Sequence, residues 1–124
     1  MNQVFAIAVG GAVGAVMRFW VSTWTYRVLG QGFPWGTLAV NVSGSLAMGF
    51  VYVLLVERLS LGPEWRAALM IGFLGAFTTF STFSVEALNL VQAGTVVRAL
   101  LYVLASVIFC VLAAYLGMIA GRQL

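Results

Sequence analysis

Residues 67–85 read AALMIGFLGAFTTFSTFSV, an uncharged run in which two glycines precede a dense group of hydroxyl-bearing side chains. The run is long enough to cross the apolar core of a bilayer, which takes about 20 residues. Two further uncharged runs, residues 28–56 and 99–121, meet the same requirement, and a fourth run over residues 4–25 carries a single charge, Arg18. We therefore expect an all-α integral membrane protein with four transmembrane helices.

The composition excludes a water-soluble domain. Of the 124 residues, 63% are hydrophobic and 7% are charged, and the mean hydropathy is +1.08. A soluble surface needs far more charge than this. The net charge of +3 comes from arginine and glutamate alone, and no run of basic residues could follow a line of phosphates, so we expect no nucleic-acid surface.

Glycine, proline and tryptophan mark the ends of the spans. We expect helices at about residues 4–25, 36–56, 66–91 and 98–120, joined by three short loops within a single domain that covers residues 1–124. The first span has no basic region before its apolar run and is followed by three more spans. It is therefore expected to be a membrane helix and not a cleavable signal peptide.

The arginines are nearly balanced across the membrane. Four spans place both termini and the second loop on one side, with Arg58, Arg66 and Arg122, and leave Arg27 and Arg98 on the other. Orientation follows the basic residues near span ends, so three against two is a weak bias. Two interpretations stay open: a single biased topology, or dual topology with copies inserted both ways and paired as an antiparallel dimer.

Small residues recur at the spacing of helix contact faces. Gly10 and Gly14 form a G-x-x-x-G pattern in the first span, and Ala113, Gly117 and Gly121 continue the spacing in the fourth. Such faces let helix backbones approach closely. The pattern predicts close helix packing without selecting one interface.

Five hydroxyls lie within residues 78–84: Thr78, Thr79, Ser81, Thr82 and Ser84. Each could bond back to a carbonyl of the preceding turn. The cluster also weakens helix propensity, so we expect the third helix to be broken near the membrane midplane, between about Gly75 and Thr79. Carbonyls freed at a break can coordinate a small cation such as Na⁺, and the N-terminus of a half-helix can attract an anion.

Two further features near this cluster allow either a packing role or an ion-binding role. Phe80 and Phe83 are three residues apart and project from one helical face, where they could pack against neighbours or turn their partly positive ring edges toward an anion. Asn41 is the amide of the second span, and its NH₂ group could bond another helix or a permeating anion.

The remaining polar residues in the spans also have two interpretations each. Tyr102, Ser106 and Cys110 lie on one stripe of the fourth helix and could form a ladder of donors or bond locally. Arg18 could extend to the headgroups or attract anions to a pore mouth. Glu86, the acid deepest in a span, could exchange protons, or belong to an ion pair or an interhelical hydrogen bond.

The segment from Gly75 to Glu86, GAFTTFSTFSVE, resembles the Fluc (CrcB) family of small fluoride channels. The similarity extends over essentially the whole chain in order. It includes Gly10-Gly11-x-x-Gly14 with Arg18, Gly36-Thr37-Leu38-x-x-Asn41, and Leu90-x-Gln92-Ala93-Gly94.

The resemblance implies a fluoride-selective channel that passively exports fluoride from the cytoplasm and lowers its toxic concentration. It further implies an antiparallel, dual-topology homodimer with two parallel pores, as a multi-pass protein of the bacterial inner membrane. A structural Na⁺ at the dimer centre would be held by the backbone carbonyls of Gly75 and Thr78.

The resemblance also assigns the anion pathway. Phe80 and Phe83 would be the aromatic pair beside it, Asn41 a donor that lines it, and Arg18 a vestibule charge. The remaining pathway residues bear hydroxyl groups: Ser81, Thr82, Tyr102 and Ser106. Cys110 stands where another hydroxyl is expected, and a thiol donates only weakly.

Other function classes remain for comparison. A proton-coupled small multidrug exporter would use Glu86, although such an exporter usually carries its carboxylate in the first helix, which here has none. A non-transporting scaffold would need only the packing faces. An enzyme is not expected, because one cysteine, no histidine and no paired carboxylates leave no nucleophile with its base.

Overall fold

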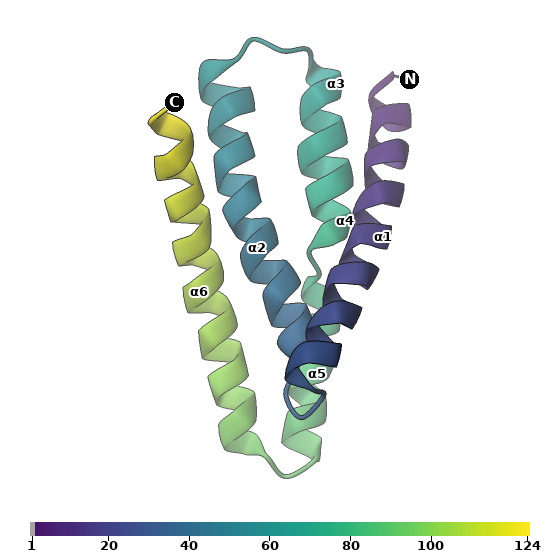
Figure 1. Cartoon of the computed structure of the whole chain (residues 1–124), viewed down its shortest axis with the longest axis vertical. Coiled ribbons are helices and arrows are strands. Elements are labelled where there is room, and N and C mark those ends of the chain that lie inside the picture. The colour runs from purple at the N-terminus through teal and green to yellow at the C-terminus, as the bar shows by residue number, and fades with distance from the viewer. Residues whose placement is uncertain (1) are drawn as a thin grey trace.

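The computed structural model of the chain describes residues 2–124, and the regular structure of these residues is entirely helical. In chain order the elements are α1 (Asn2–Leu29), α2 (Trp35–Tyr52), the π-helix η1 (Val53–Arg58), α3 (Pro63–Arg66), the π-helix η2 (Ala67–Leu74), α4 (Gly75–Phe77), α5 (Phe80–Gln92) and α6 (Val96–Arg122). They form four candidate membrane spans: Asn2–Leu29, Trp35–Arg58, Pro63–Gln92 and Val96–Arg122. The prediction of four transmembrane helices is confirmed (Figure 1).

Each observed helix extends a few residues beyond the span expected from hydropathy. Two of these helices end at a glycine. Gly30 stops α1 at a φ of 84°, and Gly94 follows α5 at a φ of 81°, a region that glycine adopts readily. Tyr26, expected to open the first loop, therefore lies within α1.

The four spans form two pairs in which neighbours run in the same direction. The first span lies beside the first half of the third span, and the second span lies beside α6. Both termini lie at the same end of the molecule as the loop that joins η1 and α3 (Figure 1). This arrangement agrees with the side assignment used above to compare the arginines.

Glycines form the contact between α1 and η2. A Cβ atom added at Gly10 would overlap the carbonyl oxygen of Ala68, and one added at Gly14 would overlap that of Phe73. At Gly72 of the opposing helix, a Cβ atom would lie 2.8 Å from the carbonyl oxygen of Ile7. The backbones are therefore in direct contact, as the G-x-x-x-G pattern predicts.

The second pair is built in the same way. A Cβ atom at Gly117 of α6 would overlap the carbonyl oxygen of Leu46, and one at Gly49 of α2 would overlap that of Ala114. Gly121 lies against Val53 of η1, where a Cβ atom would be 2.9 Å from the Cβ of the valine. Both predicted small-residue faces are thus helix contacts.

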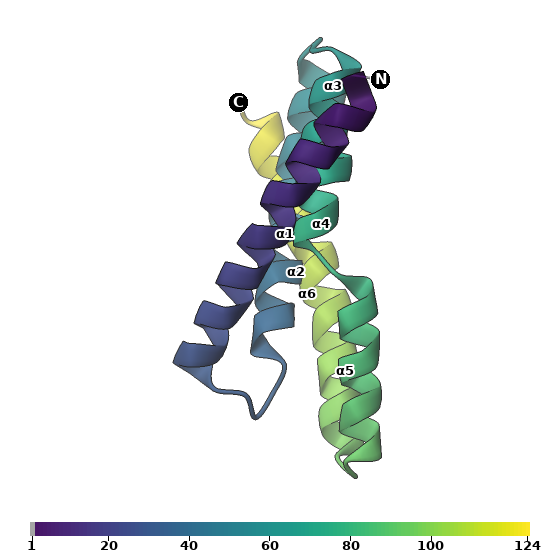
Figure 2. The same ribbon diagram turned by 90° about the vertical axis from the view of Figure 1, so that its right-hand side faces the viewer.

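The third span changes its neighbour along its length. Its first half, η2 and α4, packs on α1, whereas α5 packs on α6. Figure 2 shows α5 leaving the direction of α1 and running beside α6. The change of neighbour occurs between α4 and α5, where the helix is interrupted.

Candidate functional site

The interruption consists of two residues, Thr78 and Thr79. Both have extended backbone angles, with φ −88° and ψ 161° at Thr78 and φ −151° and ψ 116° at Thr79. Helix α4 ends at Phe77 just before them, and α5 begins at Phe80 just after them. The predicted break in the third helix is therefore confirmed.

Asn41 of α2 closes the break with two hydrogen bonds. Its Nδ2 donates to the carbonyl oxygen of Thr79 at 3.0 Å, and its Oδ1 accepts from the Thr79 N–H at 2.8 Å. The side chain thus satisfies both backbone polar groups of Thr79, which would be costly to leave unpaired at membrane depth. Asn41 is therefore an interhelical partner, and the second hydrogen of its NH₂ group is left for another acceptor.

Three of the five hydroxyls have a hydrogen bond to the backbone of the third span. Thr78 donates to the Leu74 carbonyl at 3.0 Å, which is the local bond typical of membrane helices. Thr79 instead caps α5, because its hydroxyl accepts from the Thr82 N–H at 3.2 Å. Ser84 bonds locally to Phe80 at 2.9 Å.

The break leaves backbone carbonyls without helical donors, and those of Gly75 and Thr78 are among them. In a continuous helix the Thr79 N–H would donate to Gly75, and the Thr82 N–H would donate to Thr78. Here the Thr79 N–H donates to Asn41, and the Thr82 N–H donates to the Thr79 hydroxyl. The carbonyls of Gly75 and Thr78 therefore lose their helical donors.

A cavity of about 390 Å³ lies beside the break, between α2, α5 and α6. It brings together four of the residues assigned to the anion pathway: Asn41, Phe80, Phe83 and Ser106. Its other lining residues are small, apolar or uncharged polar: Gly44, Ser45, Met48, Thr78, Thr79, Val107, Cys110, Val111 and Ala114. The described residues around this cavity thus supply donors without any charge.

The two phenylalanines are in contact but differ in exposure. Their ring centroids are 5.4 Å apart, at an interplanar angle of 48°. Phe83 is 8% exposed and rests on Tyr102, with centroids 5.1 Å apart, whereas Phe80 is 78% exposed. Phe83 is therefore fixed within the chain, and the ring of Phe80 lies mostly on its surface.

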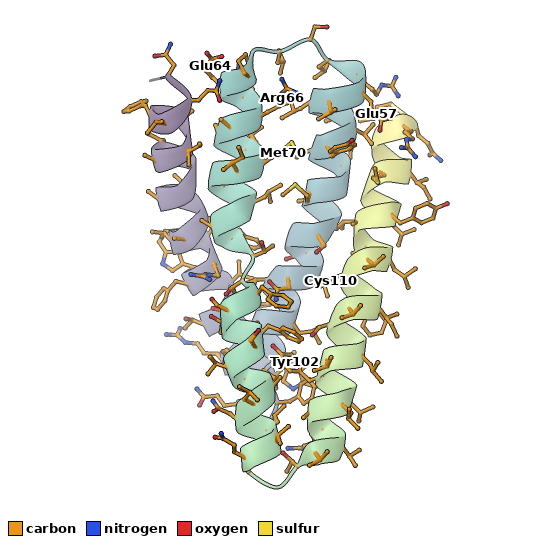
Figure 3. All side chains as sticks on the ribbon, turned by 180° about the vertical axis from the view of Figure 1, so that it is seen from behind. Glu57, Glu64, Arg66, Met70, Tyr102 and Cys110 are labelled. Carbon is orange, nitrogen blue, oxygen red and sulfur yellow. The ribbon has the colours of Figure 1, made fainter. Side chains whose placement is uncertain are left out.

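Ser106 and Cys110 face the same cavity from α6. Ser106 is buried, and its hydroxyl has no hydrogen-bond partner among the described residues. Figure 3 shows Cys110 level with the break and Tyr102 nearer the loop between α5 and α6. The predicted stripe on the fourth helix therefore faces α5, but only two of its three members line this cavity.

Arg18 and Thr82 lie together on the other side of the break. They line a separate cavity of about 200 Å³ beside α1, together with Ser22, Thr37 and Thr79. Thr79 lines both cavities. Ser81 is exposed and lies outside the lining of both, with its Oγ 3.5 Å from the Thr79 Oγ1.

Glu86 is held by two tyrosines from different helices. The Tyr26 hydroxyl of α1 donates to its Oε2 at 3.1 Å, and the Tyr102 hydroxyl of α6 donates to its Oε1 at 3.2 Å. Of the uses left open for Glu86, the structure shows the interhelical hydrogen bond. Tyr26 was missed by sequence reasoning, because it stood at the expected start of a loop and nothing in the sequence pairs it with a residue in another span.

Backbone carbonyl oxygens at the break are candidate ligands for a hard cation such as Na⁺. Among residues 2–124 no group of three or more His, Cys, Asp or Glu side chains is placed to hold a metal ion. The freed carbonyls of Gly75 and Thr78 are oxygen ligands of the kind that hard cations prefer. Gly75 is exposed, so its carbonyl is near the surface of the chain.

Comparison with known proteins identifies similar chains over almost the full length. The model of the family described as CrcB-like protein, Camphor Resistance (CrcB), matches residues 5–118. The fluoride-specific ion channel FluC of Methylococcus capsulatus is 53% identical over 98% of this chain, and the match covers 54% of that protein. FluC of Magnetococcus marinus is 52% identical over 97% of this chain and 98% of its own length. FluC of Agrobacterium fabrum is 42% identical over 100% of this chain and 99% of its own length. The chain thus spans about half of the Methylococcus protein and nearly all of the other two.

Proposed function

The chain belongs to the CrcB family, and from this we propose that it is a fluoride-specific ion channel that exports fluoride passively from the cytoplasm. The observation that carries the proposal is the uncharged cavity beside the break, where an amide, a buried hydroxyl without a partner and two aromatic rings meet. Since the family is one of channels, the chain is not an enzyme. Its four spans make it a multi-pass membrane protein, and we place it in the bacterial inner membrane.

The cavity suits a small, strongly hydrated anion. Fluoride enters it only if protein donors replace its water, and the second Asn41 hydrogen, the Ser106 hydroxyl and the phenylalanine ring edges are such donors. None carries a charge, so none would hold the ion too tightly to let it leave. Larger halides gain less from each donor and fit a narrow passage poorly, which gives selectivity.

The pathway continues beyond this cavity. Arg18 and Thr82 line the cavity beside α1, where a positive charge attracts anions, and Thr79 lines both cavities. Ser81 lies on the exposed side of α5, and Tyr102 packs against the ring of Phe83. No energy source is needed, because hydrogen fluoride enters from acidic surroundings, ionises inside and leaves as fluoride down its gradient.

We propose that two copies pair in opposite orientations as a dual-topology homodimer. A lone chain would leave Gly75, which is exposed and carries one of the freed carbonyls, facing lipid, and backbone groups without partners are tolerated at that depth only when they are covered. Phe80, 78% exposed, would likewise be covered by a partner. The near-balance of arginines allows insertion in both directions.

Such a dimer suits a structural Na⁺ at its centre. Gly75 and Thr78 would hold it through their carbonyl oxygens, which have lost their helical donors to Asn41 and to the Thr79 cap. Two carbonyls from one chain are too few for a cation, and a second copy would double the number. When bound, the ion would be coordinated by the freed carbonyl oxygens of both copies.

Fluoride efflux from liposomes containing the purified protein tests the proposal. We expect rapid fluoride release without chloride release, and loss of that release in Phe80→Ile and Phe83→Ile. Valinomycin and a potassium gradient supply the counter-current, so that only anion movement is measured. Absence of fluoride release from folded wild-type protein would refute the proposed function.

The exporter alternative is tested at Glu86. Its carboxylate is held by Tyr26 and Tyr102 and lies outside the cavity beside the break, so we do not favour proton exchange there. We expect fluoride release to occur without proton uptake, and Glu86→Gln to retain that uncoupled release. Proton movement that accompanies transport in the wild type and disappears in Glu86→Gln would favour the exporter.

A further inference from the structure

The cavity beside the break is rich in sulfur. Cys110 of α6 and Met48 of α2 both line it, and Cys110 is the only cysteine of the chain. One turn before the cysteine, the buried hydroxyl of Ser106 lines the same cavity without a hydrogen-bond partner among the described residues. Ser45 of α2 also lines this cavity. A thiol, a thioether and an unpaired hydroxyl therefore share one open space.

We propose that this cavity binds a soft monovalent cation, of the class of Cu⁺ and Ag⁺, between Cys110 and Met48. Thiolate and thioether sulfur select soft ions, whereas Mg²⁺, Ca²⁺ and Mn²⁺ need carboxylate and carbonyl oxygen. The lining contains no carboxylate, and the chain contains no histidine, so the nitrogen and carboxylate ligands of a typical zinc site are missing. The Ser106 hydroxyl is available as a weak third ligand.

Binding leaves the site without net charge. A metal–sulfur bond replaces the S–H bond of Cys110, one proton leaves to water, and the oxidation state of the metal does not change. A monovalent cation and one thiolate form a neutral pair. A divalent ion on the same two sulfurs would leave a positive charge in an apolar cavity, which is costly at membrane depth.

The consequence for transport rests on the proposed function. Phe80, Phe83 and Asn41 line the same cavity as the two sulfurs. If fluoride passes these residues, an ion held between Cys110 and Met48 fills part of its passage and blocks it. The chain would then be a fluoride channel that a soft metal inhibits through a residue of its own α6.

Silver is the probe for the test, because Ag⁺ keeps its oxidation state in air. Calorimetric titration of detergent-purified protein with silver nitrate, in chloride-free buffer, should give one Ag⁺ bound and one proton released per chain. Cys110→Ser and Cys110→Ala should lose the binding. Met48→Leu should weaken it by about tenfold or more, since a ligand is lost. Met70→Leu is the matched control, because Met70 lies on η2 above the break and outside the cavity lining (Figure 3).

Fluoride efflux in the same variants separates this inference from the proposed function. Ag⁺ should slow release through the wild type and through Met70→Leu, but not through Cys110→Ser. No release even before silver is added would refute the channel, while the titration would still decide the metal site. Unchanged silver binding in both cysteine variants, or wild-type affinity in Met48→Leu, would overturn the two-sulfur site.

Discussion

The two halves of the third span contact their neighbours through different parts of the chain. Before the break, η2 meets α1 backbone to backbone: Gly10 and Gly14 lie against Ala68 and Phe73, and Gly72 lies against Ile7 and Gly11. After the break, α5 meets α6 through side chains, with Phe83 on Tyr102 and Glu86 bonded to the tyrosine hydroxyl. Because α1 and α6 diverge (Figure 2), one straight helix could not follow both. The break therefore permits a tightly packed half and a polar, cavity-lining half within one span.

The largest effect should come from adding one methyl group in the tightly packed half. In Gly14→Ala the new Cβ overlaps the Phe73 carbonyl oxygen, so α1 must move away from η2. We expect the free energy of unfolding to fall by about 3 kcal/mol, as measured by denaturant titration in detergent micelles. In Gly11→Ala the nearest atom is the Gly72 carbonyl oxygen at 3.8 Å, so this control should be neutral. Equal losses in the two variants would mean that the loss in Gly14→Ala does not come from overlap with Phe73.

Removal of the amide that closes the break should have the next largest effect. Asn41→Ala leaves the N–H and carbonyl of Thr79 without partners, and we expect a loss of about 2 kcal/mol in unfolding free energy. Fluoride release should also fall, because the cavity loses a donor. Ser43→Ala, which removes only local bonds to the carbonyls of Ala39 and Val40, should change neither quantity. A stable Asn41→Ala would mean that the break can be satisfied without α2.

The two threonines of the break serve different halves of the third span: Thr78 bonds back to Leu74 before the break, and Thr79 caps α5 after it. Thr79→Val removes the cap of α5 and should cost about 1 kcal/mol of unfolding free energy. Thr78→Val removes only a bond to the Leu74 carbonyl, which already accepts the Thr78 N–H, and should cost less. The same denaturant titration measures both variants. A larger loss of unfolding free energy in Thr78→Val than in Thr79→Val would contradict the role of Thr79 as the cap of α5.

The smallest effect should come from an ion pair outside the third span. Arg122 and Glu57 are 3.1 Å apart at the end of the pair formed by α2 and α6, with side chains 52% and 37% exposed. Exposed ion pairs add little and are screened by salt. Glu57→Gln should leave the thermal unfolding midpoint unchanged at physiological salt. A clear drop in the unfolding midpoint would mean that the ion pair is shielded from solvent.

Hydropathy and spacing predicted the parts of this fold that depend on local sequence. The four spans, the break beside Thr78 and the contact faces at Gly10 and Gly117 follow from runs and periods that a single chain displays. The resemblance named the pathway residues, and the structure brings Asn41, Phe80, Phe83 and Ser106 to one cavity. Their part in conduction stays a prediction.

What could not be predicted depends on which helices become neighbours. Arg18 and Thr82 line a separate cavity because α1 and α2 form its walls with the break, whereas α6 lines the first cavity. The bonds from Tyr26 and Tyr102 to Glu86 join residues 60 and 16 positions apart, and no periodicity signals such pairs. The π-helical turns of η1 and η2 were also unforeseen, since both segments are ordinary apolar sequence.

The bonds between Asn41 and Thr79 have a consequence for how the protein is made. The second span is synthesised before the third, so the asparagine is already in the bilayer when the two threonines emerge from the ribosome. A third span inserted alone would have to shield the Thr79 peptide from lipid by itself. With Asn41 already in the bilayer, the break in the third span can form as that span inserts. Biogenesis should therefore depend on the order of the segments: a circularly permuted gene that translates the third span before the second should insert less efficiently, although the finished proteins would contain the same contacts.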